Sequence, residues 1–155
     1  MELPVKFGAI SEKTLEQFRK INESTLEVKY SENFYQSFLA KWTKYSWFAY
    51  VSDITVGALS AREEERNGEP GVYVMTCSVL NPYRRNKVAT KLMNHLFEAL
   101  QEEGAPKLVF MHVWTVSEDS LSFYRHLGFE VTETLEGYYK DIEPQTAYVL
   151  EKRVS

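Results

Sequence analysis

The sequence predicts an α/β protein in which helices cover a mixed central β-sheet. β-rich segments alternate along the chain with segments whose apolar residues recur at helical spacing. Their order, β-α-α-β-β-β-α-β-α-β-β, fits one sheet with helices packed on it. At 155 residues, of which 44% are hydrophobic, the chain can bury a core of its own. We therefore expect one domain over residues 1–155.

Composition argues against several classes of protein. The formal net charge of −4 disfavours direct binding to nucleic acid or to a membrane surface, because such binding needs an excess of clustered Lys and Arg. Cys77 is the only cysteine, which excludes an internal disulfide and a cysteine-rich zinc site. The histidines, at positions 95, 112 and 126, are too dispersed to suggest a metal site. No apolar stretch of about 18 residues occurs, so we expect a cytoplasmic protein that needs no metal.

Two helices are predicted near the start of the chain. Ser11 and Ser31 belong to the residue types that cap helix N-termini. Residues 26–30, between the two helices, have no clear period and are predicted to form a loop. Apolar side chains follow each serine at helical spacing: Leu15, Phe18 and Ile21 in the first helix, and Phe34, Tyr35, Phe38 and Leu39 in the second.

Three strands follow these helices. Residues 47–51 and 54–60 are β-rich and form a predicted hairpin. The charged run at 63–68 is predicted to be a solvated turn. Residues 71–80 form a strand that is apolar on both faces and therefore central. Alternation places Tyr73, Met75, Cys77 and Val79 on one face of this strand, and Val72, Val74 and Thr76 on the other.

The second half of the chain alternates helices with strands. Gly104 and Pro106 end a long amphipathic helix, and Ser117 and Gly128 bound a shorter one. A tyrosine-bearing segment at 137–144 precedes the last strand. The predicted elements are helices at 88–100 and 117–127 and strands at 108–114, 129–134 and 146–152.

Two arginines stand between the central strand and the long helix. Arg84 and Arg85 precede the first turn of that helix, where unpaired backbone N–H groups carry about half a positive charge. A helix start with adjacent guanidinium groups can hold a pyrophosphate. From these residues alone, the other interpretation is a pair of surface arginines.

Residues 84–89, Arg-Arg-Asn-Lys-Val-Ala, resemble the coenzyme A loop of the GNAT superfamily, which reads Gln/Arg-x-x-Gly-x-Gly/Ala. Lys87 stands where that family has glycine. We expect its Cβ to weaken cofactor binding and its ammonium group to restore part of it. Residues 121–129, around Tyr124, resemble the family's FYxxxGF segment between a helix and a strand.

The resemblance implies the GNAT acyl-CoA N-acyltransferase fold, a mixed central β-sheet flanked by helices. It also implies acetyl-CoA as cosubstrate, with Tyr124 protonating the departing thiolate. The cofactor-binding residues that it implies are Cys77, Val79, Arg84, Arg85, Asn86, Lys87, Val88, Ala89, Thr90, Ser117 and Tyr124.

A closer resemblance, to the San/NatE-type N-terminal protein acetyltransferases, runs over almost the whole chain. It is carried by residues 73–76, 82–85, His112 and 123–130, and most distinctively by Tyr-Tyr-x-x-Ile-Glu-Pro at 138–144. It implies acetylation of the α-amino group of protein N-termini, of the type that begins with methionine and a hydrophobic residue. The substrate-binding residues that it implies are Leu26, Val28, Tyr30, Tyr73, Met75, His112, Tyr138, Tyr139 and Ile142.

By the same resemblance, Tyr73 and His112 form the general-base pair, acting through ordered water, and Tyr124 is the third catalytic residue. Period-two counting lets Tyr73 and His112 converge if their strands adjoin. Histidine titrates near neutrality, whereas a tyrosine pKa near 10 needs perturbation unless Tyr73 only orients the water. On its own, a lone histidine on an apolar strand is more often a core residue.

Departures from the San/NatE pattern leave alternatives open. Leu26 and Glu27 replace a phenylalanine and a proline, and Ser117 replaces an asparagine near the cofactor. Together with Lys87, Ser117 keeps open a catalytically weakened or inactive subunit of a NatA/NatE-like complex. A third hypothesis is a GNAT enzyme that acts on a lysine side chain or a small amine. The expected partner is a protein or peptide N-terminus, and docking to NatA-type auxiliary and catalytic subunits stays open.

Overall fold

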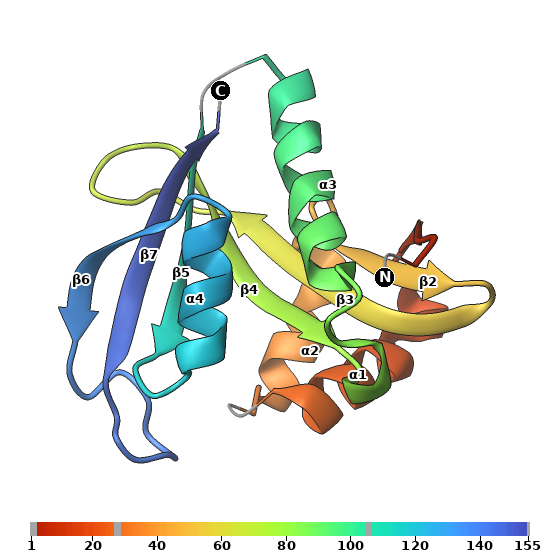
Figure 1. Ribbon diagram of the computed structural model, residues 1–155, viewed down its shortest axis with the longest axis horizontal. Coiled ribbons are helices and arrows are strands. Elements are labelled where there is room, and N and C mark those ends of the chain that lie inside the picture. Colours follow the sequence, from red (N-terminus) through yellow and green to blue (C-terminus); the bar gives the residue numbers. More distant parts are fainter. Residues whose placement is uncertain (1–2, 27–28, 105–106, 155) are drawn as a thin grey trace.

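The structure is a computed structural model that describes residues 3–26, 29–104 and 107–154. Its strands are β1 (Lys6–Ala9), β2 (Trp47–Val51), β3 (Ile54–Glu63), β4 (Gly71–Val79), β5 (Lys107–Trp114), β6 (Glu130–Leu135) and β7 (Ala147–Val154). Within the described residues they form one seven-stranded sheet in the order β1-β2-β3-β4-β5-β7-β6 (Figure 1). β4 and β5 run parallel, and the other neighbours are antiparallel. The mixed sheet agrees with the predicted order of elements.

The helices lie where the apolar spacing predicts them. They are α1 (Leu15–Thr25), α2 (Glu32–Lys41), α3 (Val88–Glu102) and α4 (Glu118–His126). Ser31 caps α2, because its Oγ accepts the backbone N–H of Phe34 at 3.2 Å. Ser11 precedes a short 3-10 turn rather than α1 itself, and Ser117 occupies the N-cap position of α4 without a side-chain capping hydrogen bond.

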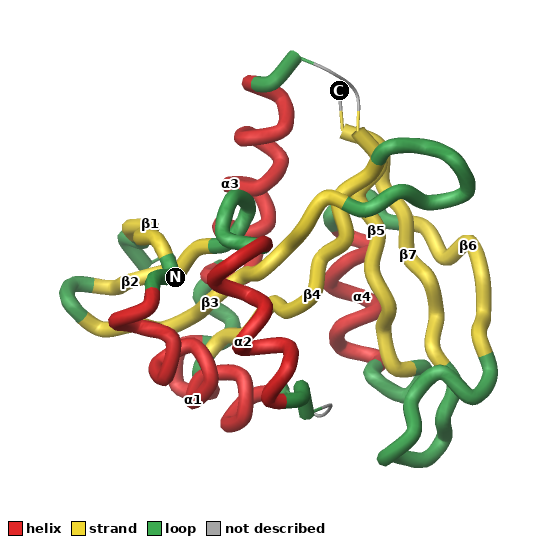
Figure 2. The backbone as a smooth tube through the Cα atoms, turned by 180° about the vertical axis from the view of Figure 1, so that it is seen from behind, coloured by secondary structure: helices red, strands yellow, loops and turns green. Residues whose placement is uncertain are grey.

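The helices cover the sheet from both sides (Figures 1 and 2). α3 and α4 lie on one face, where Leu96 of α3 shares a buried cluster with Val109 of β5. α1 and α2 lie on the other face, where Phe18 of α1 packs in a second cluster with Phe48 of β2. Each fully buried apolar side chain contributes about 1.5–3 kcal/mol relative to an exposed one, so the two clusters hold the layers together.

A β-bulge interrupts β4 at Met75. β3 and β4 pair on both sides of this position, but Met75 is one residue more than β3 can match. The extra residue reverses the alternation: Met75 packs with the cluster of α1 and α2, whereas Cys77 packs with the cluster of α3 and α4. The predicted common face of Tyr73, Met75, Cys77 and Val79 is therefore wrong, because Tyr73 and Met75 lie on one face and Cys77 and Val79 lie on the other.

β4 and β5 pair only where they begin. Residues 71–73 pair with residues 108–110, and beyond them β4 stays with β3 while β5 stays with β7. Figure 2 shows the two strands turning away from each other. The sheet is therefore open between the C-terminal halves of β4 and β5, and this opening positions the site.

Candidate active site

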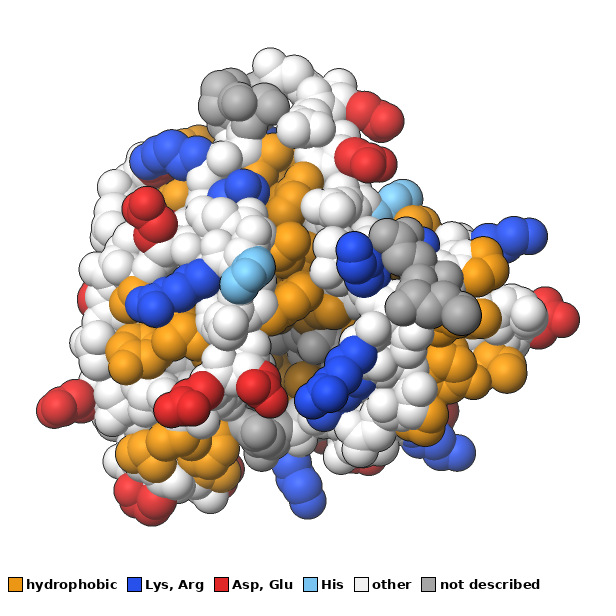
Figure 3. All heavy atoms as spheres, viewed as in Figure 1, with side chains coloured by type: hydrophobic (Ala, Val, Ile, Leu, Met, Phe, Trp, Pro, Cys, Tyr) orange, Lys and Arg blue, Asp and Glu red, His pale blue; other side chains and the backbone are white. Residues whose placement is uncertain are grey.

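A cavity of about 980 Å³ lies at the opening between β4 and β5. Figure 3 shows the hollow on the face of α3 and α4, with hydrophobic side chains along it. Its polar rims differ in charge: Arg84, Arg85 and Lys87 lie on the α3 side, and Glu118 and Asp119 lie on the α4 side. An anionic group is therefore favoured at the start of α3.

The loop before α3 holds the predicted cofactor residues in a fixed shape. Nε of Arg84 donates to the carbonyl of Val79 at 3.2 Å, and Nδ2 of Asn86 donates to the carbonyl of Arg84 at 3.0 Å. Arg85 and Lys87 adopt left-handed backbone conformations, with φ of 65° and 64°. Such a conformation costs a residue with a Cβ about 1–2 kcal/mol and costs glycine little. The backbone of Lys87 thus has the kind of conformation that favours glycine, the residue that the GNAT coenzyme A loop has at this position.

Most of the predicted cofactor residues meet at the cavity. Asn86 is the exception, because its side chain turns back to its own loop and is not part of the cavity wall. The others line the cavity: Cys77, Val79, Arg84, Arg85, Lys87, Val88, Ala89, Thr90, Ser117 and Tyr124.

Tyr124 of α4 reaches across the cavity to Cys77 of β4. Burial raises the pKa of the Cys77 thiol to about 12 and the pKa of Tyr124 well above its usual value. The two side chains also affect each other's pKa: Tyr124 lowers the pKa of the Cys77 thiol, and Cys77 raises the pKa of the Tyr124 hydroxyl. Both groups are protonated at neutral pH, so Tyr124 can act as a proton donor to a sulfur atom.

Tyr73 and His112 come together, as the sequence predicts. Oη of Tyr73 lies 2.8 Å from Nδ1 of His112 and 3.3 Å from the hydroxyl of Tyr138. The ring of Tyr138, from the loop between β6 and β7, stacks on the imidazole. Two strands and one loop thus converge on a single histidine.

Burial decides how this pair is protonated. It lowers the pKa of His112, and the nearby positive charge of Arg66 lowers it further. Burial also raises the pKa of Tyr73, and the neighbouring Tyr138 adds to that shift. At neutral pH the imidazole is therefore uncharged and can accept a proton, while the Tyr73 phenol is not ionised.

Arg66 is a residue of this site that sequence reasoning missed. It lies in the charged run at 63–68, and the prediction of a solvated turn is wrong for it, because its side chain is only 15% exposed. It pairs with Glu133 of β6 at 3.0 Å and with Glu151 of β7, and its guanidinium lies 5.6 Å from the ring centre of Phe110. Because these partners come from distant strands, no local pattern identifies Arg66.

Several predicted acceptor residues surround the same cavity. Leu26, Tyr30, Met75, His112 and Tyr139 contribute to its wall. The hydroxyl of Tyr30 donates to the carbonyl of Met75 at 2.6 Å, which ties the loop after α1 to the bulge in β4. The acceptor side of the cavity is therefore apolar and rich in tyrosine.

The remaining predicted acceptor residues lie elsewhere. Tyr73 and Tyr138 are not part of the cavity wall, although both contact His112. Ile142 is half-buried in the loop between β6 and β7 and is also outside the wall. Val28, predicted to bind substrate, lies outside the described residues, as does Glu27.

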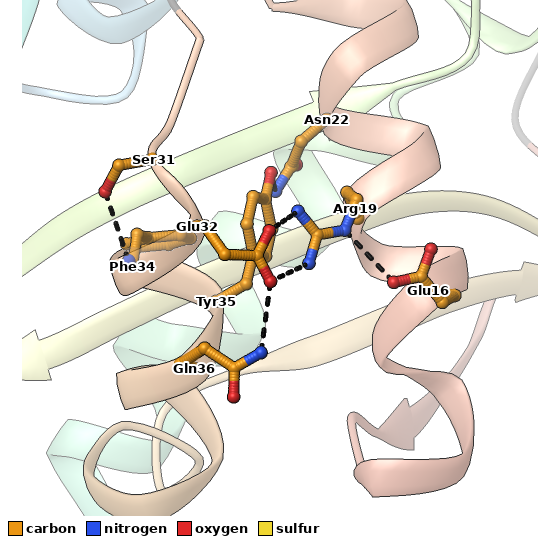
Figure 4. A network of polar contacts seen from close by, with 8 residues as sticks. All are labelled: Glu16, Arg19, Asn22, Ser31, Glu32, Phe34, Tyr35 and Gln36. Atoms are coloured by element: carbon orange, nitrogen blue, oxygen red, sulfur yellow. Dashed lines mark hydrogen bonds and ion pairs between the residues drawn. The ribbon is translucent and has the colours of Figure 1, made fainter.

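A polar network connects α1 and α2, the helices on either side of the loop that carries Leu26 and Tyr30 (Figure 4). The guanidinium of Arg19 in α1 donates two hydrogen bonds to Glu32 in α2, at 2.7 and 3.0 Å. Asn22 is buried, donates to the hydroxyl of Tyr35 at 3.3 Å and accepts a hydrogen bond from Ser78 of β4 at 2.7 Å. The network therefore anchors α1 and α2 to the strand that also carries Tyr73.

Two kinds of feature were also sought in the part of the chain that the structure describes. In residues 3–26, 29–104 and 107–154, no three His, Cys, Asp or Glu side chains are grouped so that they could hold a metal ion. No helix of these residues is long and apolar enough to cross a membrane.

Comparisons of the sequence with known proteins find relatives over almost the whole chain. The sequence model of the acetyltransferase (GNAT) family matches residues 13–129. N-alpha-acetyltransferase 50 of Danio rerio is 33% identical over 148 residues, which cover 96% of this chain and 88% of that protein. The probable N-acetyltransferase San of Drosophila melanogaster is 32% identical, with 96% and 80% covered.

The solved structures include one of similar sequence and others that share only the fold. Arabidopsis thaliana Naa50, in complex with the bisubstrate analogue CoA-Ac-MVNAL, has a TM-score of 0.85 at 34% identity and covers 96% of this chain and 97% of that one. Ard1 of Thermoplasma volcanium has the same TM-score, 0.85, at 22% identity, and covers 97% of this chain and 98% of that one. The likeness to Ard1, at this low sequence identity, therefore shows a shared fold only.

Proposed function

The chain belongs to the GNAT family of acetyltransferases, and from that premise we propose that it transfers the acetyl group of acetyl-CoA to the α-amino group of a protein N-terminus. The observation that carries the proposal is the contact between Tyr73 and His112 beside the cavity. It supplies a proton acceptor, which an amine needs as it attacks a thioester. Relatives named as N-alpha-acetyltransferases support the same class of acceptor.

The cavity suits acetyl-CoA as the cosubstrate. Arg84, Arg85 and Lys87 lie beside the N-terminus of α3, a combination that binds phosphate groups. The cavity volume of about 980 Å³ is at the upper end of the range for ligand sites, about 300–1,000 Å³, and can accommodate a long ligand. The Arabidopsis relative is solved with an analogue that contains CoA. When bound, the cosubstrate supplies the thioester carbonyl that the amine attacks.

Tyr73 and His112 act as the base. An α-amino group has a pKa near 7.7–8.0, so the base only has to take a proton as the nitrogen attacks. The Tyr73 hydroxyl takes this proton, directly or through an ordered water, and passes its own to Nδ1 of His112. The raised pKa of Tyr73 disfavours a Tyr73 phenolate. Tyr73 therefore ends the step protonated, and the imidazole of His112 carries the additional proton.

Tyr124 completes the transfer. As the acceptor nitrogen bonds to the carbonyl carbon, the C–S bond breaks and its electron pair leaves on the sulfur. The Tyr124 hydroxyl, which lies in the cavity wall and is protonated at neutral pH, then protonates the thiolate of coenzyme A. The products are an acetylated N-terminus and coenzyme A.

A methionine followed by a hydrophobic residue is the acceptor that we propose. Leu26, Tyr30, Met75 and Tyr139 give the acceptor side of the cavity an apolar wall, which favours an apolar first side chain. The analogue bound by the Arabidopsis relative contains the peptide MVNAL. A lysine side chain, which carries a charged head on an apolar stem, gains less from such a wall.

Thiol release from acetyl-CoA, measured with peptides that begin Met-Val, Met-Lys and Ser, tests the proposal. We expect the Met-Val peptide to react fastest. His112→Ala and Tyr73→Phe should each lower kcat/KM by about a hundredfold, because either change breaks the proton path and general-base catalysis contributes roughly 10²–10⁴-fold. Calorimetry should show acetyl-CoA affinity unchanged in both variants.

Three other results would contradict the proposal. Tight acetyl-CoA binding without turnover of any N-terminal peptide would favour a non-catalytic subunit. Acetyl-CoA binding that appears only in Lys87→Gly would indicate a degenerate cofactor loop. Faster acetylation of a free lysine side chain or a small amine than of any N-terminus would favour the third hypothesis.

We further propose that the protein works in the cytoplasm and docks to NatA-type subunits in a NatE-like complex. The resemblance to the San/NatE-type enzymes over almost the whole chain supports this. Copurification of the tagged chain from its own cells, followed by identification of stoichiometric partners, checks it. An active chain that copurifies with no such subunit would contradict the docking.

A further inference from the structure

The bond between Tyr73 and His112 spans the place where β4 and β5 separate. Tyr73 is the last residue of β4 that pairs with β5, and its partner there is Phe110. His112 lies two residues further along β5, on the same face as Phe110, where β5 no longer pairs with β4. The distance of 2.8 Å between the Tyr73 hydroxyl and Nδ1 of His112 therefore depends on how steeply the two strands diverge.

The connection between β3 and β4, residues 64–70, is a second link between the two halves of the sheet. Figures 1 and 2 show it extending past β5 toward β7 and β6. At its tip, the backbone groups of Arg66 and Glu69 bond to each other at 2.9 and 3.0 Å. Asn67 and Gly68 form the tight turn between them, with φ of 51° and 81°. The tip is therefore stiff, and the Arg66 side chain starts from a fixed position.

Arg66 crosses β5 and bridges the two strands beyond it. Its guanidinium lies over the ring of Phe110 on β5, and it pairs with Glu151 of β7 and with Glu133 of β6. Only 15% of the Arg66 side chain and 22% of the Glu151 side chain are exposed, so water and salt screen this pair weakly. Removal of Arg66 would leave two carboxylates without their cation.

The end of the connection also touches β5 directly. A Cβ at Gly71 would lie 3.0 Å from the carbonyl oxygen of Leu108 and 3.2 Å from the Phe110 ring, closer than a side chain normally allows. The absence of a side chain at Gly71 thus lets β5 approach the start of β4. β5 is confined between Gly71 on one side and, on the other, the β7 strand that Arg66 grips.

We propose that Arg66 is a positioning residue for the base: its bridge to Glu151 and Glu133 holds β5 against β4 and keeps His112 within hydrogen-bond distance of Tyr73. The inference rests on the proposed function. Without the bridge β5 moves away from β4, and a misplacement of about 1 Å can cost about a hundredfold in rate. This role differs from the effect of the Arg66 charge on the pKa of His112, because it also acts at pH values where the imidazole is uncharged in every variant.

Arg66→Gln tests the positioning, measured as kcat on the alkaline plateau of the pH profile with a Met-Val peptide. Arg153→Gln is the matched control. Arg153 of β7 pairs with Glu69 of the same connection at 2.9 Å, but 67% of its side chain is exposed, and such a surface pair adds little. Melting curves establish that the variants fold.

Arg66→Gln should lower the plateau kcat by about tenfold or more, and Arg153→Gln by less than about twofold. The Kd of acetyl-CoA should stay unchanged in both variants, because neither residue is part of the cavity wall. In a Tyr73→Phe background, Arg66→Gln should lower kcat by less than about twofold more, since the bond that it disturbs is already gone. A role in fold stability alone would give the same factor in both backgrounds.

Two outcomes would overturn the positioning role. They are an unchanged plateau kcat in Arg66→Gln and an equal loss of kcat in the wild-type and Tyr73→Phe backgrounds. If Arg66→Gln does not fold, Arg66→Lys carries the same comparison, because lysine keeps the charge but lacks the planar fork that bonds two carboxylates. Failure of the wild type to acetylate any N-terminal peptide would instead contradict the proposed function, so the two failures are distinguishable.

Discussion

The ring of Tyr138 lies almost parallel to the imidazole of His112, with centroids 4.1 Å apart and 12° between the planes. The loop between β6 and β7 thus covers the histidine that β5 presents. Burial is the main cause of the lowered pKa of His112, and the charge of Arg66 is the second. The contact therefore keeps the imidazole uncharged at pH values where a free histidine is already partly protonated.

The acid limb of the pH profile should reflect this environment. Because its pKa is lowered, His112 stays able to accept a proton below its usual pKa near 6.5, and kcat/KM falls only as the pH drops through the lowered value. Arg66→Gln removes a positive charge and frees the carboxylate of Glu133, and both changes raise the pKa of His112. The acid limb of kcat/KM, measured between about pH 5 and 8, should move to higher pH. A limb that stays in place or moves to lower pH would contradict this role of Arg66.

Tyr124→Phe should slow the chemical step and leave binding intact. The hydroxyl is protonated at neutral pH because burial raises its pKa, and its removal leaves the thiolate without a donor. We expect kcat to fall about a hundredfold, within the range for general acid catalysis, and the Kd of acetyl-CoA to change little. Single-turnover thiol release measures the step. Tyr50→Phe, which removes a hydroxyl outside the cavity wall, is the control. Equal rates in the two variants would exclude Tyr124 as the acid.

Lys87→Ala should weaken acetyl-CoA binding in a salt-dependent way. The ammonium of Lys87 adds positive charge to the cavity rim at the start of α3, and salt screens such an exposed charge. We expect Kd to rise about three- to tenfold at low ionic strength and less than about twofold near 1 M salt, by calorimetry. Lys20→Ala, at an exposed position of α1, is the control.

Lys87→Gly separates the charge of this residue from its backbone. It removes the same ammonium, but glycine adopts the observed φ of 64° at little cost and leaves more room for the phosphates. Lys87→Gly should therefore bind acetyl-CoA at least as well as Lys87→Ala. Weaker binding by the glycine variant would show that the Cβ does not crowd the cofactor.

Asn22→Ala should destabilise the fold. Asn22 is 2% exposed and accepts a hydrogen bond from Ser78, whose hydroxyl would be left buried without this partner. Such a loss costs about 1–3 kcal/mol of unfolding free energy. Urea unfolding measures it, and adding Ser78→Ala should cost less than it does in the wild type, because the orphaned hydroxyl is gone. Strictly additive losses would contradict the pairing of these side chains.

Local pattern was sufficient to predict most elements and part of the site. The apolar spacing at 88–100 predicts α3, and the predicted strand at 108–114 is confirmed as β5 with one residue added. Both signals depend on residues close in sequence, so they can be recognised without knowledge of the fold. The pairing of Tyr73 with His112 needed one further condition, adjoining strands, and the parallel pairing of β4 with β5 meets it.

By itself, the sequence determined the order of helices and strands, the cationic loop before α3 and the residue types of the base pair. Only the tertiary structure decided that a bulge at Met75 turns Cys77 to the opposite face, that Arg66 forms ion pairs with Glu133 and Glu151, and that Trp114 donates to Pro144. The reason is physical: strand register and contacts between distant segments depend on how the whole chain packs, and a local period carries no information about them.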